Sequence, residues 1–323
     1  MKLAVTFWLV CGLALGQVPR IGVIDFYGLQ KVSANKLRLA LGVEEGDPLP
    51  PSKADAEERL QSVDGVVLAE LHAVCCEGGK AILFVGIEEK GAQHFNFHEA
   101  PESDVTLPAE MVETYGGYLA AIEASARSNS ASTEVDTWEK RLASLAEAGS
   151  KTLREVLRTS VDADQRVIAA SMMAFSSDRP AAAQDLQYAL QDPDEDVRQN
   201  ALRSLGTIAA YAYKHPDSEI QIPPTWPVQM LNSLAWGDRI GAVNLLLTLT
   251  EKRDPEVLSL IRERALPQIA EMARWKSLTH ALPAFVLLGR LGGLTEPQIQ
   301  ENWSKGERDD QVAAMERSLK TVK

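Results

Sequence analysis

Hydrophobic and polar positions follow two different patterns along the chain. Near the N-terminus, short β-rich runs alternate with turn residues, whereas leucine and alanine recur at spacings of three and four over most of the rest. The first pattern is typical of strands and the second of amphipathic helices. The sequence therefore predicts an α+β chain that is mostly α, with a small α/β part followed by a longer helical part.

Residues 17–91 predict a domain with the order β-α-α-β-β. A β-rich run is followed by two helices that begin after serine caps, and two further apolar runs flank a glycine pair with the composition of a hairpin turn. In chain order the predicted elements are a strand at 21–27, helices after Ser33 and Ser52, and strands at 66–74 and 81–87.

Several residues of this part resemble a known family. Phe26-Tyr27-Gly28, Gly46-Asp47-Pro48-Leu49 and the closing Ile87-Glu88-Glu89 are similar, in that order, to a POTRA domain, the polypeptide-transport-associated module of outer-membrane assembly and secretion proteins. The resemblance implies a periplasmic module that associates with outer-membrane components and binds polypeptide by adding a strand to a sheet edge. We expect that edge at the first strand, with Ile21, Val23 and Asp25 as contacts.

Residues after the predicted α/β domain lack the pattern of barrel strands. Residues 92–149 instead predict a linker that contains helices, one opening after Pro108 and another carrying Trp138, Leu142 and Leu145. Of the properties that the family resemblance implies, we therefore expect polypeptide binding in this chain and do not expect an attached β-barrel.

Residues 150–323 contain a repeated pattern. Arginine and alanine recur at an offset of 32 between residues 162–169 and 194–201, and residues 237–242 and 278–291 carry weaker copies. Each copy has the composition of two short helices, which bury an apolar face only when neighbouring pairs stack. The sequence predicts an α-solenoid of about four such pairs.

The clearest copy, residues 186–206, resembles a HEAT repeat because Asp196-Val197-Arg198 follows a turn rich in aspartate. The resemblance implies a curved protein-binding surface, with turn aspartates and helix arginines that pair between successive repeats. We expect these structural roles for Asp164, Arg166, Asp194, Arg198, Asp238 and Arg239.

A proline-rich insertion interrupts the third copy and brings two tryptophans, Trp226 and Trp236, close to it. Insertions in solenoids usually emerge on one face, often the binding face, so both tryptophans are candidate binding residues. The alternative is a stiff crossover whose tryptophan packs on the next helix.

Residues 1–16 predict a signal peptide, because Lys2 precedes an apolar run that ends in Ala14-Leu15-Gly16. The run is shorter than the roughly 20 residues that span a bilayer, and no later segment approaches that length. We expect an exported protein, periplasmic or extracellular in a bacterium, with no transmembrane segment in the mature chain.

Charge narrows the class of partner. The net charge of −12 becomes −13 without residues 1–16, and basic residues do not cluster. Such a surface repels nucleic-acid phosphates. We expect protein or polypeptide partners and no nucleic acid.

Candidate chemistry is sparse. The sequence has no Gly-x-Ser-x-Gly, P-loop or Gly-x-Gly-x-x-Gly motif. His94 and His98 would share one face of a helix and could then bind a metal, but Phe95 and Phe97 alternate as in a strand, which would separate the histidines by about 13 Å at ~3.3 Å per residue. We expect neither a metal nor another cofactor.

Adjacent cysteines, Cys75 and Cys76, leave three alternatives open: two structural thiols, a vicinal disulfide, or intermolecular or redox use. The favoured function is an exported, non-enzymatic binding scaffold or adaptor, chaperone-like in envelope protein assembly or secretion. The alternatives are a thiol- or metal-dependent extracytoplasmic enzyme, which would use these cysteines or the histidine pair, and a self-associating architectural protein.

Overall fold

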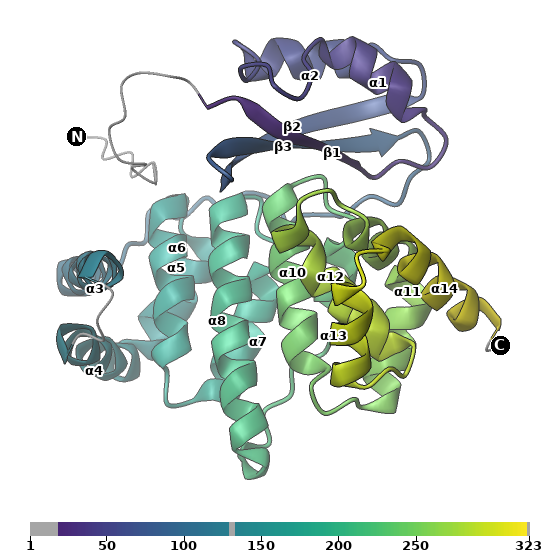
Figure 1. Ribbon diagram of the computed structural model, residues 1–323. Coiled ribbons are helices and arrows are strands. Elements are labelled where there is room, and N and C mark those ends of the chain that lie inside the picture. Colours follow the sequence, from purple (N-terminus) through teal and green to yellow (C-terminus); the bar gives the residue numbers. More distant parts are fainter. Residues whose placement is uncertain (1–18, 129–132, 322–323) are drawn as a thin grey trace. The chain divides into compact units, whose positions relative to one another are not determined.

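The computed structural model describes residues 19–128 and 133–321, which form two compact units with a boundary between Glu89 and Lys90 (Figure 1). The predicted signal peptide, residues 1–16, lies outside the described residues. Among the helices of the described ranges, none combines the length and the apolar character needed to cross a membrane.

The N-terminal unit has the predicted order of strands and helices. Its three strands form one sheet in the order β1-β3-β2, with β1 parallel and β2 antiparallel to β3. A parallel pair needs a long crossover, which the two helices and β2 supply. The elements are β1 (Ile21–Tyr27), α1 (Ala34–Leu41), α2 (Lys53–Gln61), β2 (Val66–Glu77) and β3 (Lys80–Glu89).

Both helices of this unit cover the same face of the sheet (Figure 1). Ser52 caps α2 as predicted, its hydroxyl accepting from the Asp55 N–H at 3.2 Å, and α1 ends at Gly42, whose φ of 73° suits glycine. Alternate residues of the strands pack against the apolar stripes of the helices. The core consists of Ile21, Ile24, Leu37, Leu41, Ala56, Leu60, Ala69, Leu71, Leu83, Val85 and Ile87.

Glu89 joins the end of β3 to the loop after β1. Its carboxylate is buried and accepts hydrogen bonds from the backbone N–H groups of Gln30 at 2.7 Å, Lys31 at 2.8 Å and Val32 at 2.9 Å. Burial alone would raise the pKa of Glu89, but these three donors and the charge of Lys31 outweigh it and lower the pKa below its ordinary value of 4.5.

The C-terminal unit is helical. Its described residues form six successive helix pairs, two more than the sequence predicts, because one pair precedes and one follows the recognisable copies. The pairs are α3 (Ala109–Ser128) with α4 (Thr133–Ala148), α5 (Ser150–Thr159) with α6 (Ala163–Met172), α7 (Arg179–Ala189) with α8 (Glu195–Lys214), α9 (Thr225–Met230) with α10 (Trp236–Leu249), α11 (Pro255–Ala273) with α12 (Leu278–Leu291), and α13 (Glu296–Ser304) with α14 (Arg308–Thr321).

Stacking of these pairs builds a layered array (Figure 1). The second helices α6, α8, α10 and α12 contact one another in turn, and among the first helices α5 contacts α7 and α9 contacts α11. Leucine and alanine fill the space between the layers, as the three- and four-residue spacing predicts. Short 3₁₀ helices at Met173–Phe175 and Pro216–Ser218 lie between the pairs.

Candidate functional site

Three buried arginines occupy equivalent places on α6, α8 and α10. Each donates to the backbone carbonyl six residues earlier and so closes the turn that leads into its own helix. The bonds run from Arg166 to Ser160 at 2.9 Å, from Arg198 to Asp192 at 2.8 Å and from Arg239 to Ser233 at 2.7 Å.

The same arginines bind an acidic side chain of a later helix pair, which makes an arginine–acid ladder along the array. Arg198 and Asp238 are only 3% and 0% exposed, so their charges are compensated almost entirely by each other and by nearby hydrogen bonds. The ladder pairs are Arg166 with Asp192 at 2.8 Å, Arg198 with Asp238 at 2.9 Å and Arg239 with Glu271 at 3.3 Å.

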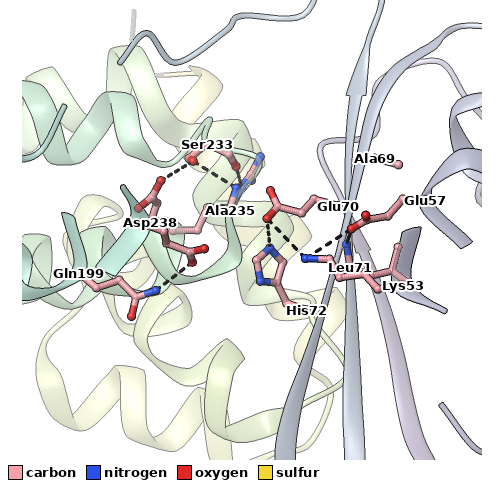
Figure 2. A network of polar contacts seen from close by, with 12 residues as sticks. Lys53, Glu57, Ala69, Glu70, Leu71, His72, Gln199, Ser233, Ala235 and Asp238 are labelled. Carbon is pink, nitrogen blue, oxygen red and sulfur yellow. Dashed lines mark hydrogen bonds and ion pairs between the residues drawn. The ribbon is translucent and has the colours of Figure 1, made fainter. Parts of the chain in front are cut away.

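Asp238 takes the ladder position because the turn between α9 and α10 carries no acid at the equivalent place. Ser233 stands where the preceding repeat has Asp192, and its hydroxyl accepts from the Ala235 N–H at 3.2 Å and donates to Asp238 at 2.6 Å (Figure 2). The acid that binds Arg198 therefore comes from α10 itself.

Asp164 and Asp194, the other predicted ladder acids, lie at helix starts. Asp194 caps α8 by accepting from the Val197 N–H at 3.1 Å, and Asp164 lies in the first turn of α6. Partial burial and the neighbouring carboxylates, chiefly those of Asp162 and Asp194, raise the pKa of Asp164. The first ladder acid can be recognised in the sequence because Asp192 lies six residues before Arg198, the next arginine of the repeat.

An extended segment, residues 94–107, crosses two of the turns that the ladder closes. At the turn between α7 and α8, the His98 N–H donates to the Gln191 carbonyl at 2.7 Å, and the Gln191 side-chain amide donates to the Asn96 carbonyl at 3.1 Å. Gln191 thus binds the backbone of the segment on both sides of Phe97.

The same segment continues to the turn between α5 and α6. The Ser103 N–H donates to Thr159 at 2.9 Å, and the Val161 N–H donates to the Ser103 carbonyl at 2.7 Å, which forms a short parallel bridge. Further on, the Leu107 N–H donates to the Gln165 side chain at 2.8 Å. The segment therefore runs along the array against the order of its helix pairs.

Two rings of the segment contact the array. The Phe97 ring lies 4.3 Å from the guanidinium carbon of Arg198, and the His98 ring stacks on Tyr188 with centroids 4.2 Å apart. The guanidinium carbon of Arg158 also lies 4.2 Å from the Tyr188 ring centroid. His98 therefore contacts an aromatic side chain, whereas His94, the other histidine of the pair considered for metal binding, is exposed.

The outer edge of β1 is partly covered by its own unit. Ile21 donates to the Asp47 carbonyl at 2.8 Å and accepts from the Gly46 N–H at 2.7 Å. Ile21 is also fully buried in the core. This end of the predicted strand-addition edge is therefore already hydrogen-bonded.

Val23 and Asp25, the other two residues expected at that edge, direct their backbone toward β3. The Ile24 N–H points the opposite way and donates to the Glu45 side chain at 3.3 Å. Because alternate residues of a strand face the same neighbour, Phe26 follows Ile24 outward, whereas Val23 and Asp25 pair with β3.

The outer edge of β2 is covered over part of its length. The Glu57 side chain accepts from the Leu71 N–H at 2.8 Å, and Gln61 donates to the Ala69 carbonyl at 3.5 Å (Figure 2 shows the contact of Glu57). By the same alternation, Ala73 directs its backbone outward. β2 continues beyond it to Glu77.

The remaining predicted residues lie in separate places. Cys75 and Cys76, near the end of β2, are joined by a disulfide, one of the three alternatives that the sequence leaves open. Trp226 is half-buried in α9, and Trp236 begins α10 and meets His280 of α12 edge to face, with centroids 5.3 Å apart. Trp236 thus connects neighbouring helix pairs.

Comparison with known families finds HEAT repeats at residues 150–219. The matched residues include the ladder turns of Arg166 and Arg198, so the predicted likeness to HEAT repeats is confirmed for this part of the array. The resemblance of the N-terminal unit to POTRA domains stays a prediction.

Solved structures similar to the chain include two designed proteins. A designed armadillo repeat protein is 16% identical, covers 65% of this chain over 98% of its own and has a TM-score of 0.35. A computationally designed armadillo repeat protein for modular peptide recognition is 14% identical, covers 65% of this chain over 97% of its own and also has a TM-score of 0.35. No curated protein matches the chain in sequence.

Proposed function

We propose that the protein is an exported scaffold that binds extended polypeptide along the turns of its helical array. One observation carries this proposal: the array holds residues 94–107 across successive turns, mainly through backbone hydrogen bonds. Contacts to a backbone are independent of sequence, so the same turns suit other extended chains.

The arginine–acid ladder supports this role because it fixes the turns. Each buried arginine holds a turn carbonyl and an acid from a later pair at once. A binding surface made by turns needs such support, since side chains that are already positioned lose less entropy when a partner arrives. The ladder is thus a scaffold for the surface, and the guanidinium of Arg198 also faces the bound segment at Phe97.

The N-terminal unit adds a second mode of binding in this proposal. The outward backbone of β2 at Ala73 offers a short sheet edge, as in the strand addition that the likeness to POTRA domains implies. This edge replaces the one that we expected at β1, where Ile21 and Ile24 are hydrogen-bonded within the unit.

Export is the further part of the proposal. The apolar run after Lys2 supports it, and so does the disulfide between Cys75 and Cys76, because disulfides persist mainly in oxidising compartments. An envelope location would bring both binding modes to unfolded or assembling envelope proteins.

Crosslinking mass spectrometry in the native host tests this function. A reagent that does not cross the cytoplasmic membrane should join the protein to envelope polypeptides, and the digest should contain a peptide that begins at Gln17. A variant lacking residues 2–16 should give neither product. Failure of the intact chain to crosslink with any polypeptide would contradict the proposed function.

A further inference from the structure

The surface that holds Phe97 and His98 has the properties of a ligand site. We call it the turn surface and define it by Tyr188 of α7, Gln191 of the turn and Arg198 of α8. Tyr188 offers a ring face, Gln191 offers a carbonyl acceptor and an amide donor, and Arg198 offers the face of a guanidinium. Neighbouring residues of an extended chain point to opposite sides, which lets Phe97 meet Arg198 while His98 meets Tyr188.

The segment occupies the turn surface with few contacts of its own. Phe97 is 41% exposed and meets the ring of the buried Phe95 of the same segment, with centroids 5.2 Å apart, and Asn96 and Glu99 are also exposed. Segments with little buried apolar area and a small number of surface hydrogen bonds open at low cost. Residues 96–98 can therefore leave the turn surface while the helices stay folded.

His98 is also an imperfect occupant. Its Nδ1 atom is buried and has no hydrogen-bond partner among the described residues. A buried polar atom without a partner weakens binding, whereas a carbocyclic ring of similar size would keep the stacking on Tyr188 without that cost. The turn surface thus fits a second aromatic ring better than it fits the imidazole of the chain itself.

We infer that residues 96–98 are an exchangeable internal ligand, and that the turn surface binds an extended partner polypeptide carrying two consecutive aromatic residues. The inference deepens the proposed function by naming the chemistry of the partner. One aromatic ring packs on the guanidinium of Arg198, the next stacks on Tyr188, and Gln191 binds the backbone on either side of the first ring. A linked internal ligand competes at a high effective concentration, so only a better-fitting partner displaces it.

Peptide binding to opened and intact protein tests the inference. The probe is a fluorescent synthetic peptide of residues 92–104, measured by anisotropy. In the opened variant, Phe97→Ala with His98→Ala, the internal ligand loses both rings, so the peptide should bind at least tenfold more tightly than to the intact protein. The control variant, Glu99→Gln with Glu102→Gln, alters exposed side chains of the same segment outside residues 96–98 and should bind as the intact protein does.

One further protein variant identifies the surface, and two altered peptides identify the chemistry of the ligand. Adding Tyr188→Leu to the opened variant should weaken binding at least tenfold, with the helical circular dichroism unchanged. A peptide with phenylalanine in place of His98 should bind the opened variant more tightly than the native peptide does, and a scrambled peptide should not bind.

Hydrogen exchange gives a readout that needs no substitution. Saturating phenylalanine peptide should speed exchange of the His98 amide in the intact protein, because that amide loses its bond to Gln191. Equal affinity for intact and opened protein, or no affinity for the opened variant, would overturn the inference. If envelope polypeptides still crosslink to the chain, only the inference fails; if the opened variant binds the peptide but the host yields no partner, only the proposed function fails.

Discussion

Arg198 holds three parts of the array at once. Its guanidinium closes the turn before α8, binds Asp238 of α10 and lies against the ring of Phe97. Removing the side chain would leave the fully buried carboxylate of Asp238 without its arginine partner. A single residue therefore couples the stability of the scaffold to the geometry of the turn surface.

Arg198→Ala should lower the free energy of unfolding of the helical array by about 3–5 kcal/mol, the cost of breaking a buried ion pair from one side. Arg203→Ala on the same helix is the matched control, because Arg203 is exposed and should cost less than about 1 kcal/mol. Urea denaturation of both variants measures the difference. Similar losses for the two arginines would contradict a structural role for the ladder.

Glu89→Gln should destabilise the N-terminal unit by about 1–3 kcal/mol at pH 7, because three backbone donors lose a charged acceptor. The pKa of Glu89 is lower in the folded state, so its contribution is present above pH 4.5 and is lost as the pH falls through the folded pKa. The gap between wild type and variant should therefore narrow in acid. Denaturation at several pH values checks this, with the exposed Glu58→Gln as the control.

At the scale of elements, the sequence predicts the helices and strands that form because of the local pattern of apolar, polar and turn residues. The strand at 21–27, the helix starts after Ser33 and Ser52 and the order β-α-α-β-β follow from alternation and turn chemistry. The Ser52 side chain caps its helix, whereas that of Ser33 makes no cap hydrogen bond, and the two later strands extend further into their hairpin than expected. Docking of residues 94–107 was not predictable, because the bond between His98 and Gln191 joins distant positions and leaves no periodic signal. Asp238, which was expected to pair between repeats, binds Arg198 from α10 because Ser233 stands at the equivalent turn position.

Helices α3 and α4 pack through a glycine. A methyl group on Gly117 would lie 2.5 Å from the Trp138 ring, whereas the neighbouring Gly116 has open space. Gly117→Ala should therefore destabilise the array by about 1–3 kcal/mol through overpacking. Gly116→Ala should instead stabilise it by up to about 1 kcal/mol, because alanine favours a helix. Thermal unfolding of the two variants should shift in opposite directions, and a shift in the same direction would refute the close packing.

At the scale of the whole molecule, the two patterns of the sequence correspond to two compact units. The difference concerns residues 92–149, expected as a linker, which belong to the same compact unit as the array. Their two helices lack the aspartate and arginine signature, so repetition in sequence does not reveal them, yet they contact α5 and α6 as another stacked pair would. Packing thus extends the array beyond its recognisable repeats.

The insertion before α9 has a consequence for how this array tolerates change. Arg198 lies on α8 and Asp238 on α10, two helices that pack directly against each other, so residues 215–224 lie outside the contact that spaces the ladder and can vary in length. That loop is where a foreign domain, a fluorescent reporter or an affinity tag should be accepted with least disturbance.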